Sequence, residues 1–392
     1  MLKINIFGST GTIGEKTLKI INTYFPKIKI NLLLANQNYK KLSKQAKLYK
    51  AKYVCLINDS KYKLLNKELK NTKIKIISSL EVNDYIKNSY SDISILSISG
   101  YSSLKFIESI IINTKNLGLV NKECIVSAGS IIKKLCLKYS TNLFPLDSEH
   151  YSIHNYFKKQ NKIEYNKVRN IFLTASGGPL FNKKLQDIKN ISFNDIKKHP
   201  KWKMGFKNSI DSATLVNKCL EIVEAHYLFN IQYKKLKIVI HPEALIHSII
   251  EFNDNTSSLN YFYHDMFIPI YNFLSLNNNN IINDNKFVKY NFNTNICLKF
   301  SDPNPSNFPA LRIFNNIDKT KCENLIKFNT GNELAIDLFS KNLINFTQII
   351  DIIEKSLLIN VDFKINNIQN ILIYKKSLIN KLRSKLNLYY EK

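Results

Sequence analysis

Near its N-terminus the chain reads Lys3-Ile4-Asn5-Ile6-Phe7-Gly8-Ser9-Thr10-Gly11-Thr12-Ile13-Gly14, and this stretch decides the fold. Its first half alternates like a short β-strand, and the apolar residues after the glycines are spaced for one buried helix face. Strand, glycine loop and helix in this order are the context of a dinucleotide-binding motif, because glycines let the backbone approach a pyrophosphate. The spacing G-x-x-G-x-x-G is a variant of the commonest form, so a plain tight turn remains the alternative.

Further strand-like runs alternate with helical stretches along the first part of the chain. They lie at residues 28–35, 53–57, 73–77, 93–99, 117–120 and 142–146. This alternation predicts an α/β fold with a Rossmann-like, doubly wound parallel sheet over residues 1–146.

The residues after two of these runs bear on a cofactor. The run at residues 28–35 is followed by Asn36-Gln37-Asn38, where an NAD site would carry an acid for the ribose 2′-hydroxyl. Because no carboxylate stands there, a 2′-phosphate is not repelled, and NADPH is favoured over NADH. Asn121-Lys122-Glu123 follows the sixth run of the sheet, where Lys122 suits a substrate oxygen and its neighbours suit the nicotinamide ribose. A polar helix start is the alternative for this tripeptide.

The last run ends in Phe144-Pro145-Leu146-Asp147-Ser148-Glu149-His150. The carboxyl ends of parallel strands border the ligand crevice of open α/β sheets, so these polar residues are candidates for a site. Asp147 and Glu149 offer oxygen ligands to a hard divalent cation, and Ser148 can bond a substrate hydroxyl. A strand end followed by a helix cap is the alternative.

A second region, predicted as an α+β catalytic domain over residues 147–276, contains an anion site. Ser176-Gly177-Gly178-Pro179 resembles a phosphate nest after a strand. Asp211 is expected to cap a helix on which Asn217, Lys218 and Glu221 share one side, with Ser212 near its positive end. Such a face suits a phosphate beside a metal ligand.

A looser segment at about residues 181–206 is predicted as a lid. It contains His199 and Trp202, the only tryptophan of the chain, and a buried core tryptophan is the alternative. His241 and His247 are expected to be structural or interface residues. An Asn-rich stretch predicts a linker over 277–300, and helical patterns at 311–317, 333–343, 346–358 and 368–388 predict a C-terminal helical domain over 301–392.

Composition limits the class of protein. The 392 residues are 44% hydrophobic, which indicates a folded chain with more than one domain. The net charge of +27 comes almost wholly from dispersed lysines, so nucleic-acid binding is not favoured. Six cysteines without C-x-x-C spacing indicate neither disulfides nor zinc. No apolar run is long enough for a membrane span and the N-terminus does not read as a signal peptide, so we expect a soluble, cytoplasmic protein.

These motifs, taken in order, resemble the 1-deoxy-D-xylulose 5-phosphate reductoisomerase family over essentially the whole chain. The resemblance rests on the glycine loop, Asn121-Lys122-Glu123, Pro145 to His150, Ser176 to Pro179, His199-Pro200-x-Trp202-x-Met204-Gly205, Asp211 to Glu221, His241-Pro242-x-x-x-Ile246-His247-Ser248 and Asn329-Thr330-Gly331-Asn332-Glu333. Members convert 1-deoxy-D-xylulose 5-phosphate into 2-C-methyl-D-erythritol 4-phosphate on the methylerythritol phosphate route to isoprenoids, using NADPH and Mg²⁺ or Mn²⁺, and are homodimers.

The resemblance implies a role for each matching residue. It implies metal ligands at Asp147, Glu149 and Glu221, and catalytic roles for Lys122, Glu149, His199 and Glu221. It implies substrate contacts at Lys122, Ser148, Glu149, Ser176, His199, Trp202, Ser212, Asn217, Lys218 and Glu221. It implies NADPH contacts at Thr10, Gly11, Thr12, Ile13, Asn36, Gln37, Asn38, Asn121, Glu123 and Gly205.

Several positions differ from the family pattern without removing a metal or phosphate ligand. Cys124 replaces a common serine, Ser103 a common glycine, and Thr330 and Gly331 two alanines. Three rival functions stay open: another metal-dependent NADPH oxidoreductase, a nucleic-acid-binding protein, and a catalytically weak relic of the same fold.

Overall fold

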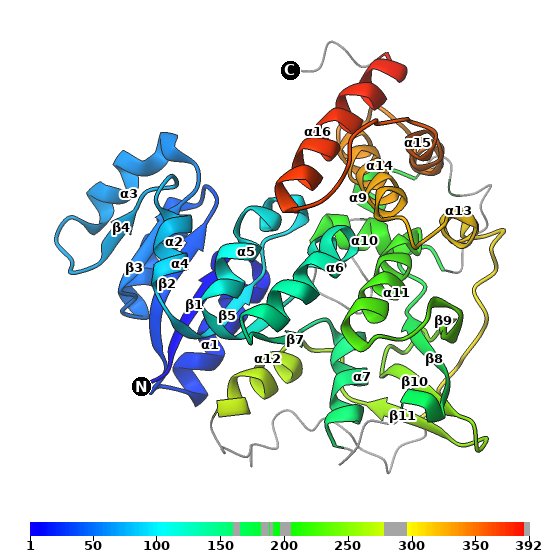
Figure 1. Ribbon diagram of the computed structural model, residues 1–392, viewed down its shortest axis with the longest axis horizontal. Helices are drawn as coiled ribbons and strands as arrows, with labels where there is room; N and C mark the ends of the chain where they lie inside the picture. The colour runs from blue at the N-terminus through cyan, green and yellow to red at the C-terminus, as the bar shows by residue number, and fades with distance from the viewer. Residues whose placement is uncertain (160–164, 182–187, 189–190, 197–204, 278–295, 388–392) are drawn as a thin grey trace. The chain divides into compact units, whose positions relative to one another are not determined.

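The computed structural model describes residues 1–159, 165–181, 188, 191–196, 205–277 and 296–387 (Figure 1). The chain divides into two compact units. The first comprises Met1–Cys124, Ser130–Tyr151 and Asp265–Asn285, and the second comprises Ile125–Gly129, Ser152–His264 and Lys286–Lys392. None of the described helices is both long and apolar enough to span a lipid bilayer.

The first unit is built on a seven-stranded parallel sheet. Its strands are β1 (Lys3–Phe7), β2 (Lys29–Ala35), β3 (Tyr53–Leu56), β4 (Lys75–Ile77), β5 (Ser91–Leu96), β6 (Thr114–Leu119) and β7 (Asn142–Pro145). The order is β4-β3-β2-β1-β5-β6-β7, so the direction of winding reverses between β1 and β5. Such a reversal is the point where a doubly wound sheet binds its ligand. The predicted Rossmann-like sheet is therefore confirmed.

Helices connect these strands, as the alternating pattern of the sequence predicts. They are α1 (Thr12–Tyr24), α2 (Tyr39–Leu48), α3 (Tyr62–Leu69), α4 (Val82–Asn88), α5 (Leu104–Ile112) and α6 (Lys122–Lys138), with short 3₁₀ turns at Asp59–Lys61 and Gly100–Ser103. In α1, Leu18, Ile20 and Ile21 are buried, as their spacing predicts. The later helix α12 (Phe267–Leu274) also belongs to this unit, where Phe267 meets Tyr24 of α1 with ring centroids 5.6 Å apart.

The second unit contains a small four-stranded sheet, as predicted for this region. Its strands are β8 (Val168–Ala175), β9 (Leu236–Ile240), β10 (Ile246–Phe252) and β11 (Ser257–Tyr261), in the order β11-β10-β8-β9. β8 and β9 run parallel, and the other two pairs are antiparallel.

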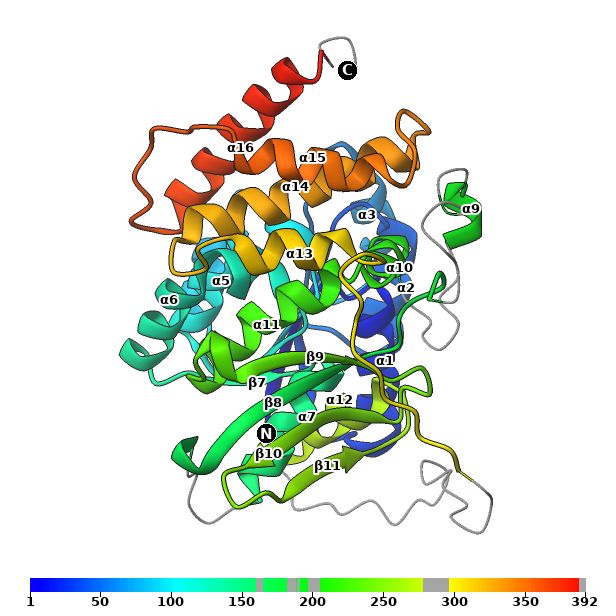
Figure 2. The ribbon, with the colours of Figure 1, turned by 90° about the vertical axis from the view of Figure 1, so that its right-hand side faces the viewer.

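Helices of the second unit lie in layers beside this sheet. Figure 2 shows α11 (Val216–Phe229) and α13 (Pro309–Asn316) between the sheet and the pair α14 (Cys322–Ser340) and α15 (Gln348–Leu357). The remaining helices are α9 (Phe193–Ile196), α10 (Phe206–Ala213) and α16 (Ile368–Lys385), with 3₁₀ turns at Tyr165–Lys167 and Tyr233–Lys235. α7 (Ser148–Lys158) begins in the first unit and continues in the second.

The start of α14 differs from the prediction. The helical pattern was expected from Glu333, whereas the helix begins at Cys322. Its middle turn consists of Asn329, Thr330, Gly331 and Asn332, all buried, and these polar residues interrupt the apolar stripe by which a helix is recognised. Gly331 lies against α15, where an added Cβ would come within 2.3 Å of the Ser356 Oγ.

Two predicted segments fall largely outside the described residues. Of the expected lid at 181–206, the described part includes α9 and the first residue of α10. The expected linker at 277–300 is described only at Asn277, which ends a 3₁₀ turn that begins at Ser275, and from Ile296 onward.

Candidate metal and substrate site

Asp147 and Glu149 lie where β7 passes into α7. Leu146 still donates to the Leu119 carbonyl at 2.9 Å, which continues the sheet pairing for one more residue. The Asp147 carbonyl then accepts from the Tyr151 N–H at 2.7 Å, and its Oδ1 accepts from the Glu149 N–H at 3.2 Å. Asp147 thus caps the helix, as the alternative interpretation of this stretch predicts.

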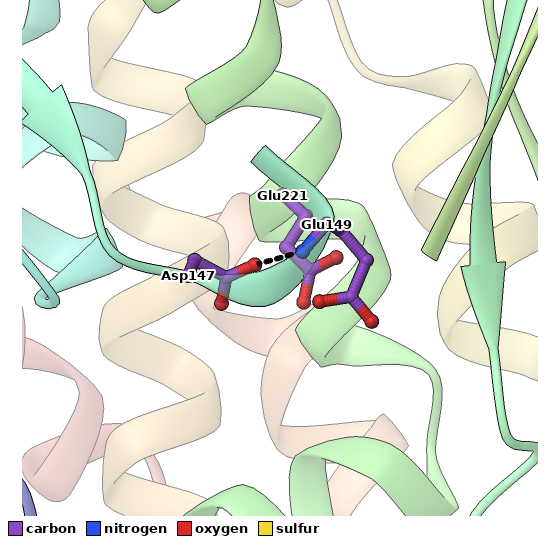
Figure 3. Close-up of side chains that lie close together, drawn as sticks. All are labelled: Asp147, Glu149 and Glu221. Carbon is purple, nitrogen blue, oxygen red and sulfur yellow. Dashed lines mark hydrogen bonds between the residues drawn. The ribbon is translucent and has the colours of Figure 1, made fainter. Parts of the chain in front are cut away.

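The same aspartate belongs to a cluster of three acids. One carboxylate oxygen from each of Asp147, Glu149 and Glu221 lies within 4.8 Å of the other two. Figure 3 shows the three side chains close together, with Asp147 and Glu149 on one segment and Glu221 on α11. Asp147 therefore caps α7 and also belongs to the acidic cluster.

Cations and hydrogen-bond donors surround these carboxylates. Lys122 at the start of α6 forms an ion pair with Asp147, and the side chains of both are largely buried. Lys218 Nζ lies 2.7 Å from Glu221 Oε2, where the side chains are only 7% and 1% exposed. Asn217 donates to the other oxygen of Glu221. Three acids this close repel one another, so each charge needs compensation of this kind.

The donor set fits a divalent metal ion of the hard class. All three clustered groups are carboxylates, whose oxygens suit Mg²⁺ and Mn²⁺, and no sulfur or imidazole belongs to the cluster among the described residues. Two of the three side chains belong to buried residues, where uncompensated negative charge is costly. The chemistry of the residues present is thus that of a magnesium or manganese site.

His150 also contacts the cluster, although no role is predicted for it from the sequence. Its ring is fully buried and its Nδ1 lies 3.2 Å from Asp147 Oδ1. The three-residue spacing from a helix-capping aspartate is the signal that indicates this contact.

The anion-binding residues lie on a broken helix, which corrects one prediction. Asp211 was expected to cap a single helix, but it lies inside α10, and α11 starts separately at Val216. The break comes at Leu215, which has a left-handed backbone with φ of 60° and a buried side chain. Ser212 therefore lies in the last turn of α10, and Asn217 and Lys218 lie in the first turn of α11.

The Ser176 loop lies directly against this break. Gly177 and Gly178 have φ of +80° and +72°, and a Cβ on Gly178 would come within 2.7 Å of the Ala213 nitrogen and the Ser212 carbonyl carbon. Only glycine permits this approach. The loop that carries Ser176 and the turn that carries Ser212 are consequently neighbours.

Ser148, another predicted substrate contact, donates to Glu149 Oε2 at 2.6 Å.

The predicted cofactor residues of the first unit follow the carboxyl ends of β1, β2 and β6. Thr10 and Gly11 precede α1, Thr12 and Ile13 are its first residues, and Asn36, Gln37 and Asn38 are exposed after β2. Asn38 caps α2 by accepting from the Lys41 N–H at 3.1 Å. The Lys41 side chain itself forms an ion pair with Glu15 of α1.

Asn121 and Glu123 are buried at the start of α6. Asn121 caps this helix by accepting from the Cys124 N–H at 2.8 Å, and it donates to the Ile98 carbonyl at 2.7 Å. The polar helix start is thus present as well. Gly205 precedes α10, and no atom of the described residues lies within 4 Å of the position of a Cβ.

The other predicted residues divide into two groups. His199 and Trp202 lie outside the described residues, so their predicted substrate contacts stay predictions. His241 and His247 are buried, and ring nitrogens lie 2.9 Å from the Lys299 carbonyl and 3.1 Å from the Phe262 carbonyl, respectively. These contacts agree with the structural interpretation.

Burial keeps several other groups on α7 and α11 uncharged. Burial raises the pKa of the Tyr151 hydroxyl and of the Cys219 thiol above their usual ranges. Burial, assisted by the charge of Lys158, lowers the pKa of His154 to about 4. Tyr151, Cys219 and His154 therefore carry no charge at neutral pH.

Comparisons with known proteins bear on this site. Residues 4–129 match the family model described as 1-deoxy-D-xylulose 5-phosphate reductoisomerase, residues 143–229 match the model of its C-terminal domain, and residues 263–379 match a further DXP reductoisomerase C-terminal domain. A 1-deoxy-D-xylulose 5-phosphate reductoisomerase of Pelagibacter ubique is 39% identical over 353 residues, covering 89% of each chain. One of a Wolbachia strain of Drosophila simulans is 34% identical over 360 residues, covering 91% of this chain and 90% of the relative.

Solved structures agree with the sequence relatives. The Zymomonas mobilis 1-deoxy-D-xylulose 5-phosphate reductoisomerase in complex with NADPH has a TM-score of 0.84 at 28% identity, with 98% of each chain covered. A DOX-P reductoisomerase in complex with NADPH, fosmidomycin and magnesium has a TM-score of 0.91 at 27% identity, with 99% of each chain covered.

Proposed function

From the premise that this chain belongs to the 1-deoxy-D-xylulose 5-phosphate reductoisomerase family, we infer that its carboxylate cluster serves the reaction of that family. The chain is an NADP-dependent oxidoreductase that converts 1-deoxy-D-xylulose 5-phosphate into 2-C-methyl-D-erythritol 4-phosphate, with a divalent metal. This places it in the non-mevalonate route to isoprenoids. The observation that carries the assignment of the site is the convergence of Asp147, Glu149 and Glu221.

The three clustered carboxylates would hold Mg²⁺ or Mn²⁺. Their oxygens supply the hard, anionic donors that these ions prefer, and Lys122, Lys218 and His150 hold the acids in place through the contacts described above. When bound, the ion supplies Lewis acidity toward the substrate's carbonyl and neighbouring hydroxyl oxygens.

Lys122, Ser148 and Glu149 would act on the part of the substrate that rearranges. The Lys122 ammonium lies beside Asp147, from where it can donate a hydrogen bond to a substrate oxygen that gains negative charge. Ser148 can donate to a substrate hydroxyl in place of its present bond to Glu149. His199 and Trp202 complete the predicted substrate contacts, and Trp202 would exclude water as part of a closing lid.

Ser176, Ser212, Asn217 and Lys218 would bind the phosphate of the substrate. Two hydroxyls, an amide and an ammonium are suitable partners for a phosphate dianion. The approach of Gly178 to the Ser212 backbone supports a compact site. Because the phosphate does not react, its binding energy serves to orient the rest of the substrate.

NADPH would occupy the carboxyl end of the first sheet, where the winding reverses. Thr10 to Ile13 would contact the pyrophosphate, Asn36 to Asn38 the adenosine ribose and its 2′-phosphate, and Asn121, Glu123 and Gly205 the nicotinamide half. The absence of a carboxylate at residues 36–38 supports NADPH over NADH.

We also propose a cytoplasmic homodimer and four functional segments: NADPH binding at 1–146, metal and substrate binding at 147–276, a linker at 277–300 and a helical domain at 301–392. Light scattering of the purified chain tests the dimer, and a mass of one chain at micromolar concentration contradicts it.

The decisive assay is NADPH oxidation with 1-deoxy-D-xylulose 5-phosphate and Mg²⁺ or Mn²⁺. We expect turnover that a chelator abolishes and added metal restores. Oxidation with another sugar phosphate but not with this one would favour the rival oxidoreductase.

A single substitution tests the proposed metal ligand on α11. Glu221→Gln removes one of three anionic donors, so we expect turnover to fall by about 100-fold or more while NADPH binding, followed by fluorescence, changes little. Glu224→Gln is the matched control, because Glu224 is equally buried on α11 but does not belong to the cluster. Near-normal turnover of Glu221→Gln, or an equal loss in the control, would refute the metal role.

A further inference from the structure

A buried hydrogen bond joins α10 to the C-terminal helical region. Asn332 of α14 donates through Nδ2 to Asp211 Oδ1 at 2.7 Å. The Asp211 side chain is 2% exposed, and Asn332 is fully buried. A buried carboxylate destabilises the fold unless its oxygens accept hydrogen bonds, so this hydrogen bond contributes more to stability than an exposed one would.

The second oxygen of Asp211 is occupied from its own helix. Lys207, one turn earlier on α10, places its Nζ 2.8 Å from Asp211 Oδ2. One carboxylate oxygen thus accepts from α14 and the other from α10, which fixes the orientation of the side chain. The last turn of α10 is tied to α14 through this one residue.

The next residue along the chain is Ser212, one of the proposed phosphate ligands. Its backbone packs against Gly178, since a Cβ on that glycine would lie 2.7 Å from the Ser212 carbonyl carbon. Ser212 therefore lies between two constraints, the Asp211 bond and the Gly178 contact. After it, the left-handed Leu215 redirects the chain toward Asn217 and Lys218.

We propose that Asp211 and Asn332 are positioning residues for the substrate phosphate. Through their hydrogen bond, α14 sets where Ser212 lies relative to Asn217 and Lys218. This inference rests on the proposed function, because it assumes that Ser212 binds the phosphate. It gives the C-terminal helical region a part in substrate affinity.

A scaffold bond and a positioning bond have different consequences. If the contact only stabilises the fold, its loss lowers the unfolding temperature and leaves the Michaelis constants unchanged. If it positions Ser212, its loss raises the KM for the sugar phosphate and leaves the KM for NADPH unchanged.

The test compares four variants. Asn332→Ala removes the donor, and Asn332→Asp sets a second carboxylate against Asp211. The double exchange Asp211→Asn with Asn332→Asp restores a donor and an acceptor in reversed positions. Asn329→Ala is the matched control, because Asn329 is also fully buried on α14 and neither of its side-chain polar atoms has a hydrogen-bond partner among the described residues.

We expect Asn332→Ala to raise the KM for 1-deoxy-D-xylulose 5-phosphate by about tenfold, with the KM for NADPH within about twofold. Asn332→Asp should raise it further, and the double exchange should recover most of the loss. An unchanged sugar-phosphate KM in folded Asn332→Ala, an equal rise in the Asn329→Ala control, or no recovery in the double exchange would overturn the proposal.

The proposed function is checked separately with the unmodified chain. If that chain does not turn over the sugar phosphate, calorimetric binding of inorganic phosphate replaces KM as the readout. The positioning role then holds if Asn332→Ala weakens phosphate binding more than Asn329→Ala does, and it fails if both bind as the unmodified chain does.

Discussion

Two turns in this molecule lead into helices that carry proposed ligand contacts, and they are held in different ways. The loop from Gly8 to Gly14 depends on missing side chains, because Gly8 has φ of +88° and a Cβ on Gly14 would lie 2.5 Å from the Gly8 carbonyl oxygen. The turn at Leu215 depends on side chains that are present. Its left-handed residue is a leucine that is 1% exposed, and its carbonyl accepts from the Lys218 and Cys219 N–H groups at 3.1 Å.

The difference shows which kind of change each turn resists. A left-handed leucine costs free energy that glycine would avoid, so burial of its side chain must offset the strain. The glycine loop carries no such strain, but its close backbone contacts leave no room for a side chain. We therefore expect the first turn to fail when a methyl group is added and the second when packing is removed.

The largest effect is expected for Gly14→Ala. In an ordinary helix this change stabilises, but here the new Cβ meets the backbone of Gly8 and Ser9 at 2.5 Å, which cannot yield cheaply. We expect a loss of about 3 kcal/mol in the free energy of unfolding, measured by denaturant titration, and weaker NADPH binding. Gly205→Ala is the stability control, since none of the residues that the structure describes comes within 4 Å of its Cβ position, and its unfolding should be nearly unchanged. Equal stability of the two variants would contradict the steric account.

An intermediate effect is expected at Leu215. Leu215→Ala should cost about 2 kcal/mol of unfolding free energy through the lost packing. Leu215→Gly loses the same side chain but relieves the backbone, so it should be about 1 kcal/mol more stable than Leu215→Ala. At most helix boundaries with negative φ the order is reversed. If Leu215→Ala has a higher free energy of unfolding than Leu215→Gly, the backbone at Leu215 carries no strain and the contrast between the two turns fails.

The smallest effect is expected for Gln45→Met. Gln45 on α2 donates through Nε2 to the Ser9 carbonyl at 2.9 Å, which is a side-chain tie added to a loop that glycines already shape. We expect a loss of about 1 kcal/mol or less in unfolding free energy and a KM for NADPH within about threefold of the unmodified chain. A tenfold rise in that KM would show that the glycine loop, too, relies on a side chain.

The same contrast explains which parts of the structure follow from the sequence. The sheet and the glycine loop are encoded locally, in the alternation of Lys3 to Phe7 and in the spacing of three glycines, so both are predictable. The acidic cluster joins Asp147 and Glu149 to Glu221, which is far along the chain, and only the resemblance to a family linked them before the structure was known.

The errors arise where the local sequence pattern does not contain the information that decides the structure. Asp211 has the features of a helix cap, yet its partner is Asn332, and no local pattern connects residues this far apart. The break at Leu215 is equally hidden, because leucine is a poor sign of a left-handed turn. Asn329, Thr330 and Asn332 conceal the first half of α14 for the same reason: polar residues normally indicate an exposed surface.

The contact between Gly331 and Ser356 limits how this protein can be recombined with its relatives. A methyl group at position 331 would overlap the hydroxyl and Cβ of Ser356 at 2.3 and 2.7 Å. A chimera that imports α14 from an alanine-bearing relative would therefore need a smaller residue at position 356, or α15 from the same donor. Breakpoints for shuffling with such a relative therefore belong outside both helices.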